Sequence, residues 1–239
     1  SLPHPNPHQK IKQRYGLLTP SPNSKVEAKI DRSTHCPGGG STASMKITGT
    51  GADKRGNPTG LQYPYLRWEG KELNFRPGKE YQCDVWLRQK GLADGKVTVQ
   101  VGDRVTKELD VSSKWKKFSF EVPNDKPVGK GIYHLLVGAK NPGTIWLDNL
   151  VIYEKGVEPF TVYPHWVETL KSYRPGIIRN MNGLGLLTFD NLLSQGFTRK
   201  PVWNPKSGPA SGWSQGNISL PAFLELCEKT QVLKLTLQP

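Results

Sequence analysis

The chain has 239 residues, of which 35% are hydrophobic, and its 7 Trp and 8 Tyr are enough to build ordinary buried cores, which excludes a chain disordered by composition. Its formal net charge of +13 favours acidic partners such as an anionic polysaccharide, a nucleic acid or an anionic surface. Apolar runs stay well below the roughly 18 residues of a membrane-spanning helix, so we predict no membrane span.

The basic residues are spread along the chain instead of forming one block, which favours solvated faces over a nucleic-acid groove. We find no zinc-ligand spacing, phosphate-cradling glycine motif or aromatic-basic RNA motif. Nucleic-acid binding is therefore only a minor alternative. The cysteines Cys36, Cys83 and Cys227 match no known motif, and a disulfide between the first two is compatible with the sequence but not required by it.

Residues 25–155 show the pattern of an antiparallel β-sandwich, and residues 1–24 are predicted to be an N-terminal extension. Short runs of alternating apolar and polar residues are separated by turn sequences such as NPTG, RPGK, ADGK and NPG. Several strands at this spacing are typical of a sandwich. The predicted strands are SMKIT, EYQCDVWLRQ, KVTVQVG, KWKKFSFEV, IYHLLVGA and TIWLDNLVIYE.

The strand predicted over residues 81–88 has two different faces. One face is apolar and is expected to enter the core, with Tyr81, Cys83, Val85 and Leu87. The other places an aromatic residue among polar ones, with Gln82, Asp84, Trp86 and Arg88. Trp115 and Trp146 lie among alternating apolar positions, so we predict both to be core residues.

Sugar rings stack their C–H faces on exposed aromatic rings, while amides, carboxylates and guanidinium groups bond the sugar hydroxyls. The second face therefore predicts a substrate-binding surface. We expect Tyr63, Tyr65 and Trp68, from the segment LQYPYLRWEG, to join Gln82, Asp84, Trp86 and Arg88 there. The alternative is that Trp86 fills the sandwich and the tyrosines pack a loop.

The hydrophobic period changes after residue 155. Trp166, Val167, Leu170 and Tyr173 mark a short helix that ends at RPG, and IIRNM follows as a buried strand. Ser219 is placed to cap a closing helix, LPAFLELCEKT, before a strand over 232–237. This order predicts parallel strands. Two parallel strands cannot be covered on both faces by so few elements, so residues 156–239 are predicted to be an incomplete α/β segment.

Two sets of motifs carry family resemblances. The stretch NFRPGKEYQCDVWLRQ, followed by WKKFSFEVP and TIWLDNLVIYE, resembles carbohydrate-binding modules with a galactose-binding-like jelly roll. The segments VETLKSYRPGIIRNMNG, FTRKPVW and LPAFLELCEKT resemble the start of a (β/α)8 glycoside hydrolase barrel of the α-L-arabinofuranosidase type. That family usually has Pro-Gly-Gly after the strand arginine, whereas this chain has RNMNG, which affects the expected sugar specificity.

The resemblance also implies individual residue roles. Arg179, Asp190 and Asn191 would lie at the mouth of the barrel and contact substrate, although Arg179 pairing with a loop carboxylate is an equal alternative. Asp148 matches a position where such modules bind a structural calcium ion, with Glu27 as a second ligand; its alternative role is a hydrogen-bonding turn residue. No other cofactor is expected.

The resulting hypothesis is an extracellular or cell-envelope protein that binds a plant-type or other polysaccharide, including anionic ones. The family's catalytic glutamates lie on later barrel strands, so we assign no catalytic residue and expect this chain alone to be inactive. A C-terminal segment or a partner chain would complete the barrel. The alternatives are a structural or adhesive assembly protein that uses the sandwich, and a basic binder of nucleic acid or acidic surfaces.

Overall fold

The computed structural model describes residues 16–18, 26–38, 43–65, 75, 78–125, 133–157, 164–180, 193, 202–203, 213–214, 219–231 and 234–237, in places by the backbone alone. These residues fall into two units that divide between Lys155 and Gly156, and each unit is described by itself. None of the helices that the structure describes has the length and apolar character needed to cross a membrane.

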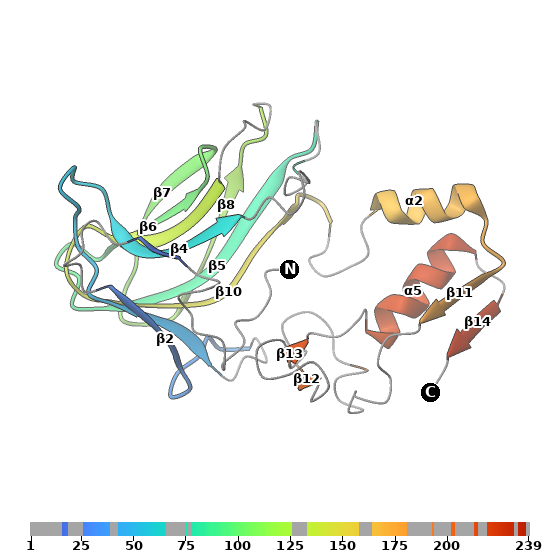
Figure 1. The fold of residues 1–239 in the computed structure, drawn as a ribbon, viewed down its shortest axis with the longest axis horizontal. Coiled ribbons are helices and arrows are strands. Elements are labelled where there is room, and N and C mark those ends of the chain that lie inside the picture. Colours follow the sequence, from blue (N-terminus) through green and yellow to red (C-terminus); the bar gives the residue numbers. More distant parts are fainter. Residues whose placement is uncertain are drawn as a thin grey trace. The chain divides into compact units, whose positions relative to one another are not determined.

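The first unit is a β-sandwich built from two five-stranded antiparallel sheets (Figure 1). The first sheet has the order β1 (Gly16–Leu18), β4 (Thr59–Tyr65), β9 (Tyr133–Ala139), β6 (Lys96–Val101) and β7 (Val105–Asp110). The second has the order β2 (Glu27–Asp31), β3 (Ser44–Thr48), β10 (Thr144–Glu154), β5 (Tyr81–Lys90) and β8 (Lys116–Val122). The predicted antiparallel sandwich is confirmed.

The sandwich begins earlier in the chain than predicted. β1 lies inside the expected extension of residues 1–24, yet its backbone pairs with β4, with Gly16 opposite Gln62 and Leu18 opposite Gly60. A strand of three residues is too short to show a convincing alternation of apolar and polar side chains. Its membership of the sheet therefore became visible only from the pairing.

The core lies between the two sheets, and alternate residues of each central strand enter it. Tyr81, Cys83, Val85 and Leu87 of β5 are buried, as predicted from the alternation. Other fully buried side chains come from both sheets: Ile47, Val97, Val99, Val101, Val122, Val137 and Ile145. The three cysteines are buried and free, so the compatible Cys36–Cys83 disulfide does not form.

Two glycines allow β4 and β9 to approach closely in the first sheet. Gly60 and Gly138 lie opposite each other in the register. A Cβ atom at Gly60 would lie 2.1 Å from the Val137 carbonyl oxygen, and one at Gly138 would lie 2.5 Å from the Thr59 carbonyl oxygen. Both obstacles are backbone atoms, so they can move only with the strands. This part of the sheet therefore requires residues without a Cβ atom.

The second unit contains two helices and a pair of parallel strands. Its elements are α2 (Pro164–Tyr173), β11 (Ile177–Asn180), α5 (Leu220–Thr230) and β14 (Lys234–Leu237), together with a short antiparallel pair, β12 (Val202–Trp203) and β13 (Trp213–Ser214). β11 and β14 pair in parallel from Ile177–Lys234 to Asn180–Leu237. The predicted helix, strand, helix, strand order and its parallel pairing are confirmed. The barrel itself stays a prediction.

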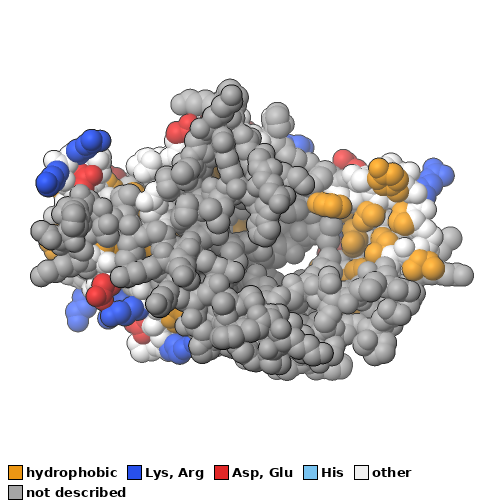
Figure 2. Space-filling model, viewed as in Figure 1, with side chains coloured by type: hydrophobic (Ala, Val, Ile, Leu, Met, Phe, Trp, Pro, Cys, Tyr) orange, Lys and Arg blue, Asp and Glu red, His pale blue; other side chains and the backbone are white. Residues whose placement is uncertain are grey.

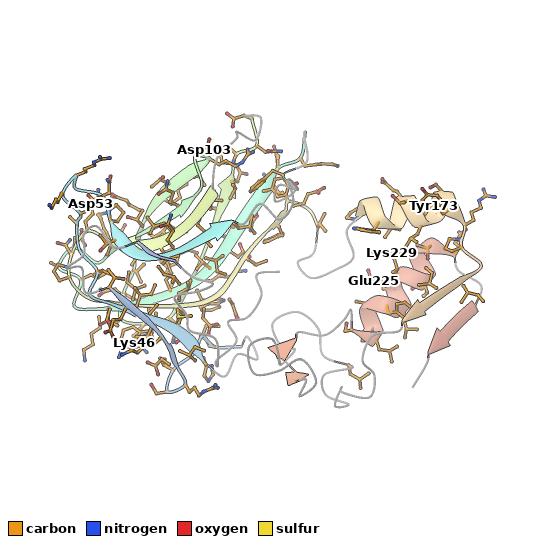
Figure 3. The ribbon with its side chains drawn as sticks, in the orientation of Figure 1. Lys46, Asp53, Asp103, Tyr173, Glu225 and Lys229 are labelled. Carbon is orange, nitrogen blue, oxygen red and sulfur yellow. The ribbon has the colours of Figure 1, made fainter. Side chains whose placement is uncertain are left out.

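Helix α5 follows the signals in its sequence. The Ser219 hydroxyl accepts a hydrogen bond from the Ala222 N–H, as expected of a cap, and the helix ends at Gln231 in the left-handed conformation. Phe223, Leu226 and Cys227 are buried along one face. On the opposite side Glu225 pairs with Lys229 (Figure 3). The helix is therefore amphipathic.

Apolar side chains also gather on the surface of this unit, over α2 and α5 (Figure 2). The large exposed ones among the described residues of the unit are Trp166 and Tyr173 of α2, Ile177 of β11, Leu224 of α5, and Leu193. Tyr173, labelled in Figure 3, is 79% exposed at the end of α2.

The close approach of β4 and β9 generates a stability prediction. Gly138→Ala should lower the free energy of unfolding by about 1–3 kcal/mol, because the new methyl group meets the Thr59 backbone. Urea unfolding followed by tryptophan fluorescence measures the effect. Gly51→Ala is the matched control, since its Cβ would have no atom within 4 Å. Equal unfolding midpoints for the two variants would contradict the prediction.

Candidate functional site

The outer face of the second sheet carries the residues that the sequence singled out on β5. The strand register arranges them in rows that cross the sheet. One row runs through Lys29, Lys46, Trp146 and Arg88. The next runs through Asp148, Trp86 and Lys117. Rows two residues apart are separated by about 6.6 Å along the strands.

A loop formed by residues 31–38 lies over one end of this face. The Trp146 indole N–H donates to Asp31 Oδ2 at 2.9 Å, and the Cys36 backbone N–H donates to Asp148 Oδ2 at 2.9 Å. The loop is also tied to β3, because the Ser44 hydroxyl donates to the Thr34 carbonyl at 2.9 Å. Three residues of the sheet, Trp146, Asp148 and Ser44, therefore hold the loop by hydrogen bonds.

The two tryptophans at this end of the face are not interior residues of the sandwich. Trp146 is 7% exposed, so its predicted burial is confirmed, but it shares the outer face with Lys46 and Arg88. Trp115 is only half-buried, and its indole N–H donates to Thr34 Oγ1 at 3.2 Å. The prediction that both pack between the two sheets is therefore wrong. They lie on the outer face of the second sheet, where the loop of residues 31–38 contacts them.

Arg88 stands between the covered and the open parts of the face. Its guanidinium lies 4.6 Å from the Trp146 ring centre and 6.0 Å from that of Trp115. One Nη donates to Thr34 Oγ1 at 3.1 Å, while its Nε has no hydrogen-bond partner among the described residues. Arg88 is thus positioned by two aromatic rings; its unpaired Nε is buried, and its Nη groups keep donors that the described residues do not use.

At the other end of the face, Asp84 is the centre of a polar cluster. Gln82 Nε2 donates to its Oδ1 at 2.9 Å, and the Tyr153 hydroxyl donates to its Oδ2 at 3.1 Å. Lys117 Nζ lies 2.8 Å from the same Oδ2. Burial would raise the pKa of Asp84, but hydrogen bonds from Gln82, Lys117 and Ser119 outweigh it and lower the pKa. The carboxylate is therefore charged and fixed at neutral pH.

Trp86 lies between these two groups. It is opposite Asp148 on β10 and Lys117 on β8, in the middle of the sheet. Its side chain is half-buried, and its indole N–H has no hydrogen-bond partner in the described part of the chain. An aromatic ring with an unused donor, supported by fixed polar neighbours, is suited to stack on a ring that carries hydroxyls.

Of the other predicted binding residues, two are on a different sheet, and the rest stay predictions. Tyr63 and Tyr65 are on β4, which belongs to the first sheet and not to the sheet of β5; their side chains lie outside the described residues. Trp68, Asp190 and Asn191 also lie outside them. Arg179 is on β11 of the second unit, where only its backbone is described.

The proposed calcium ligands, Asp148 and Glu27, are not brought together. In the register Glu27 is level with Thr144, four residues from Asp148 along β10, or about 13 Å. Glu27 pairs instead with Lys29 at 2.8 Å, and Asp148 accepts backbone hydrogen bonds from Cys36 and Asn149. Among the described residues no group of three metal-ligating side chains exists. The structural calcium ion itself stays a prediction from the resemblance.

Sequence reasoning missed Tyr153, Lys117 and Thr34. Tyr153 was hidden by a bulge between Asp148 and Val151, where Asn149 adopts a φ of 43°. Before the bulge the even-numbered residues of β10 face outward, and after it the odd-numbered ones do. The alternation of apolar and polar residues in KKFSFEV would have predicted that Lys117 faces outward. Thr34 lies in a loop, where no periodic pattern of side chains predicts which residues contact the sheet.

No protein-family model and no curated protein matches the chain significantly. Among solved structures, the arabinose-bound α-L-arabinofuranosidase MgGH51 matches with a TM-score of 0.62 and 12% identity over 95% of this chain. This chain spans 37% of the length of that enzyme. At such low identity the likeness concerns the fold.

Two carbohydrate-binding structures match with lower scores. The xylan-binding CBM22-1 domain of Paenibacillus barcinonensis Xyn10C has a TM-score of 0.43 and 12% identity, covering 64% of this chain and 93% of that domain. The CBM22-1–GH10 modules of Clostridium thermocellum Xyn10B match with a TM-score of 0.39 and 17% identity. The match covers 59% of this chain and 26% of that protein. The α-L-arabinofuranosidase resemblance identified in the sequence thus has a counterpart in fold among solved structures.

The loop contacts predict a strongly acidic titration of Asp31. Donation from the Ser33 hydroxyl and then from Trp146 lowers the pKa of Asp31 to about 2. A lowered pKa stabilises the folded state above the unfolded value of about 3.9, and this contribution is lost as pH falls towards 2. Carboxyl carbon NMR should show a midpoint near 2, and Ser33→Ala should raise it.

Asp53 provides the internal control for this titration, because its own pKa is lowered by Asn57 in a separate loop. It should titrate identically in wild type and Ser33→Ala. A midpoint for Asp31 that does not move in Ser33→Ala would show that these loop contacts are not what lowers its pKa.

Proposed function

We propose that the sandwich binds a polysaccharide across the outer face of its second sheet, with Trp86 as the stacking platform. The observation that carries the proposal is the position of Trp86: half-buried, central in the sheet, with an indole N–H that no described residue uses and polar groups on either side. The fold-level likeness to an arabinose-bound glycosidase supports it.

The polar groups beside Trp86 have the chemistry that sugar hydroxyls need. Gln82 and Lys117 offer hydrogen-bonding groups to a sugar, and the buried Asp84 carboxylate already holds both side chains in place. Because Asp84 fixes these groups before a ligand arrives, less side-chain entropy is lost on binding. The cluster would therefore orient a sugar ring that stacks on Trp86.

We extend the proposal to the second unit, as the opening of a glycosidase barrel in which Arg179, Asp190 and Asn191 contact substrate. The parallel pairing of β11 with β14 and the packing of α2 against α5 support this assignment. The proposal names no catalytic residue and places the protein outside the cell or in its envelope, where polysaccharides occur.

A structural or adhesive role is the second candidate, and one observation favours it. Trp166, Tyr173, Ile177 and Leu224 expose apolar surface on the second unit. Surfaces of this kind serve protein contacts. A nucleic-acid binder would instead show steep salt dependence without sugar preference.

The proposed site predicts a loss of binding when Trp86 is removed. Trp86→Ala should weaken binding to polysaccharides at least tenfold, because the stacking platform is lost. A glycan microarray identifies the ligand, and affinity electrophoresis in that polysaccharide measures the change. Trp166→Ala, on the second unit, is the control and should bind as wild type does.

Thermal unfolding of Trp86→Ala distinguishes lost binding from lost folding. If wild type binds no glycan on the array, or if a folded Trp86→Ala binds as tightly as wild type, the proposed site is wrong.

A further inference from the structure

We infer that the polysaccharide recognised at this face carries carboxylates, as uronic acid residues do, and that Lys46 and Arg88 bind them. The inference rests on the proposed function, since it names the ligand class of the same face. It starts from the row that crosses the sheet through Lys29, Lys46, Trp146 and Arg88. This row contains three cations and no carboxylate.

The cations of the outer face differ in how they are neutralised. Lys29 pairs with Glu27 at 2.8 Å, and Lys117 pairs with Asp84 at 2.8 Å. For Lys46 and Arg88 no ion pair exists among the described residues. Both instead lie over the Trp146 ring, at 5.5 Å and 4.6 Å from its centre. Two cations on one ring, neither of them directly paired with a carboxylate among the described residues, keep the capacity to bind an anion.

The neighbouring carboxylates do not neutralise these two cations by direct pairing. Asp31 influences Lys46 electrostatically, but its oxygens accept hydrogen bonds from Ser33 and Trp146. Asp148 accepts from the backbone N–H groups of Cys36 and Asn149. Both carboxylates are thus committed to holding the loop of residues 31–38.

Arg88 has the donor geometry that a carboxylate requires. A guanidinium presents five N–H donors in a planar fork, and the described residues use one of them, the bond to Thr34. Trp146 and Trp115 already limit its motion. A fixed arginine with free donors favours a carboxylate over a hydroxyl, because charge-assisted bonds are about twice as strong as neutral ones.

The distance between the two parts of the face fits a sugar with a charged substituent. Arg88 lies two residues from Trp86 along β5, on the same face and about 6.6 Å away. A ring stacked on Trp86 can therefore direct its carboxylate towards Arg88. Lys46 lies two strands further across the sheet, about 10 Å from Arg88 between backbones, where a carboxylate on a neighbouring sugar can reach it. Lys46, labelled in Figure 3, is half-buried and lies on β3, beside β2 at the edge of the sheet.

The test compares acidic polysaccharides with their carboxyl-reduced forms, which have the same sugar rings and linkages but no charge. Glucuronoxylan and polygalacturonate serve as probes in affinity electrophoresis at fixed salt. Wild type should bind at least one acidic form about tenfold or more tightly than its reduced counterpart. Lys46→Gln should reduce this preference at least threefold and bind the reduced form as wild type does. Lys29→Gln, whose cation is already paired, is the matched control.

The outcomes separate this inference from the proposed function. Equal wild-type affinity for the acidic and reduced forms, with both lost in Trp86→Ala, would overturn the inference and leave the proposed function standing. No binding to either form or to any arrayed glycan would overturn both. Binding to poly-L-glutamate as tight as to the acidic polysaccharide would overturn the inference by showing a general polyanion surface. Arg88→Lys, which keeps the charge but loses the fork, should retain only part of the preference.

Discussion

The bulge in β10 between Asp148 and Val151 is the constraint on which the outer face depends. Asn149 takes a left-handed conformation there, and its N–H donates to the Asp148 carboxylate at 2.8 Å. The same carboxylate accepts from Cys36, while the Asn149 amide donates to Cys36 Sγ. One irregularity therefore changes the phase of the strand and anchors the loop of residues 31–38.

The two effects of the bulge divide the face into a covered and an open part. On the covered side Trp146 is buried beneath the loop, and on the open side the change of phase brings Tyr153 to Asp84. Trp86 remains between them with part of its ring exposed. The proposed binding surface is thus the part of the outer face that the loop of residues 31–38 does not cover.

The charges of the face follow from the same arrangement. Carboxylates that would otherwise pair with cations are occupied: Asp31 by Ser33 and Trp146, and Asp148 by backbone N–H groups. A carboxylate held by several donors stabilises the fold, but it is less available as a partner for a nearby lysine or arginine. Holding the loop therefore leaves Lys46 and Arg88, next to the stacking position, without a direct ion pair among the described residues, while Asp31 acts on Lys46 only through space.

The sequence by itself determined the local features: the alternation of β5, with Tyr81, Cys83, Val85 and Leu87 buried, the cap of α5 at Ser219, and the parallel order of the second unit. These depend on side-chain periodicity and short-range hydrogen bonds, which neighbouring residues specify. Only the tertiary structure decided that Tyr63 and Tyr65 belong to another sheet than Trp86, that Trp146 lies on the outer face, and that Asp148 and Glu27 lie apart. Those features depend on the strand order, on the bulge and on the contact between Cys36 and Asp148, which are 112 residues apart in the sequence. Local sequence patterns do not predict such long-range pairings.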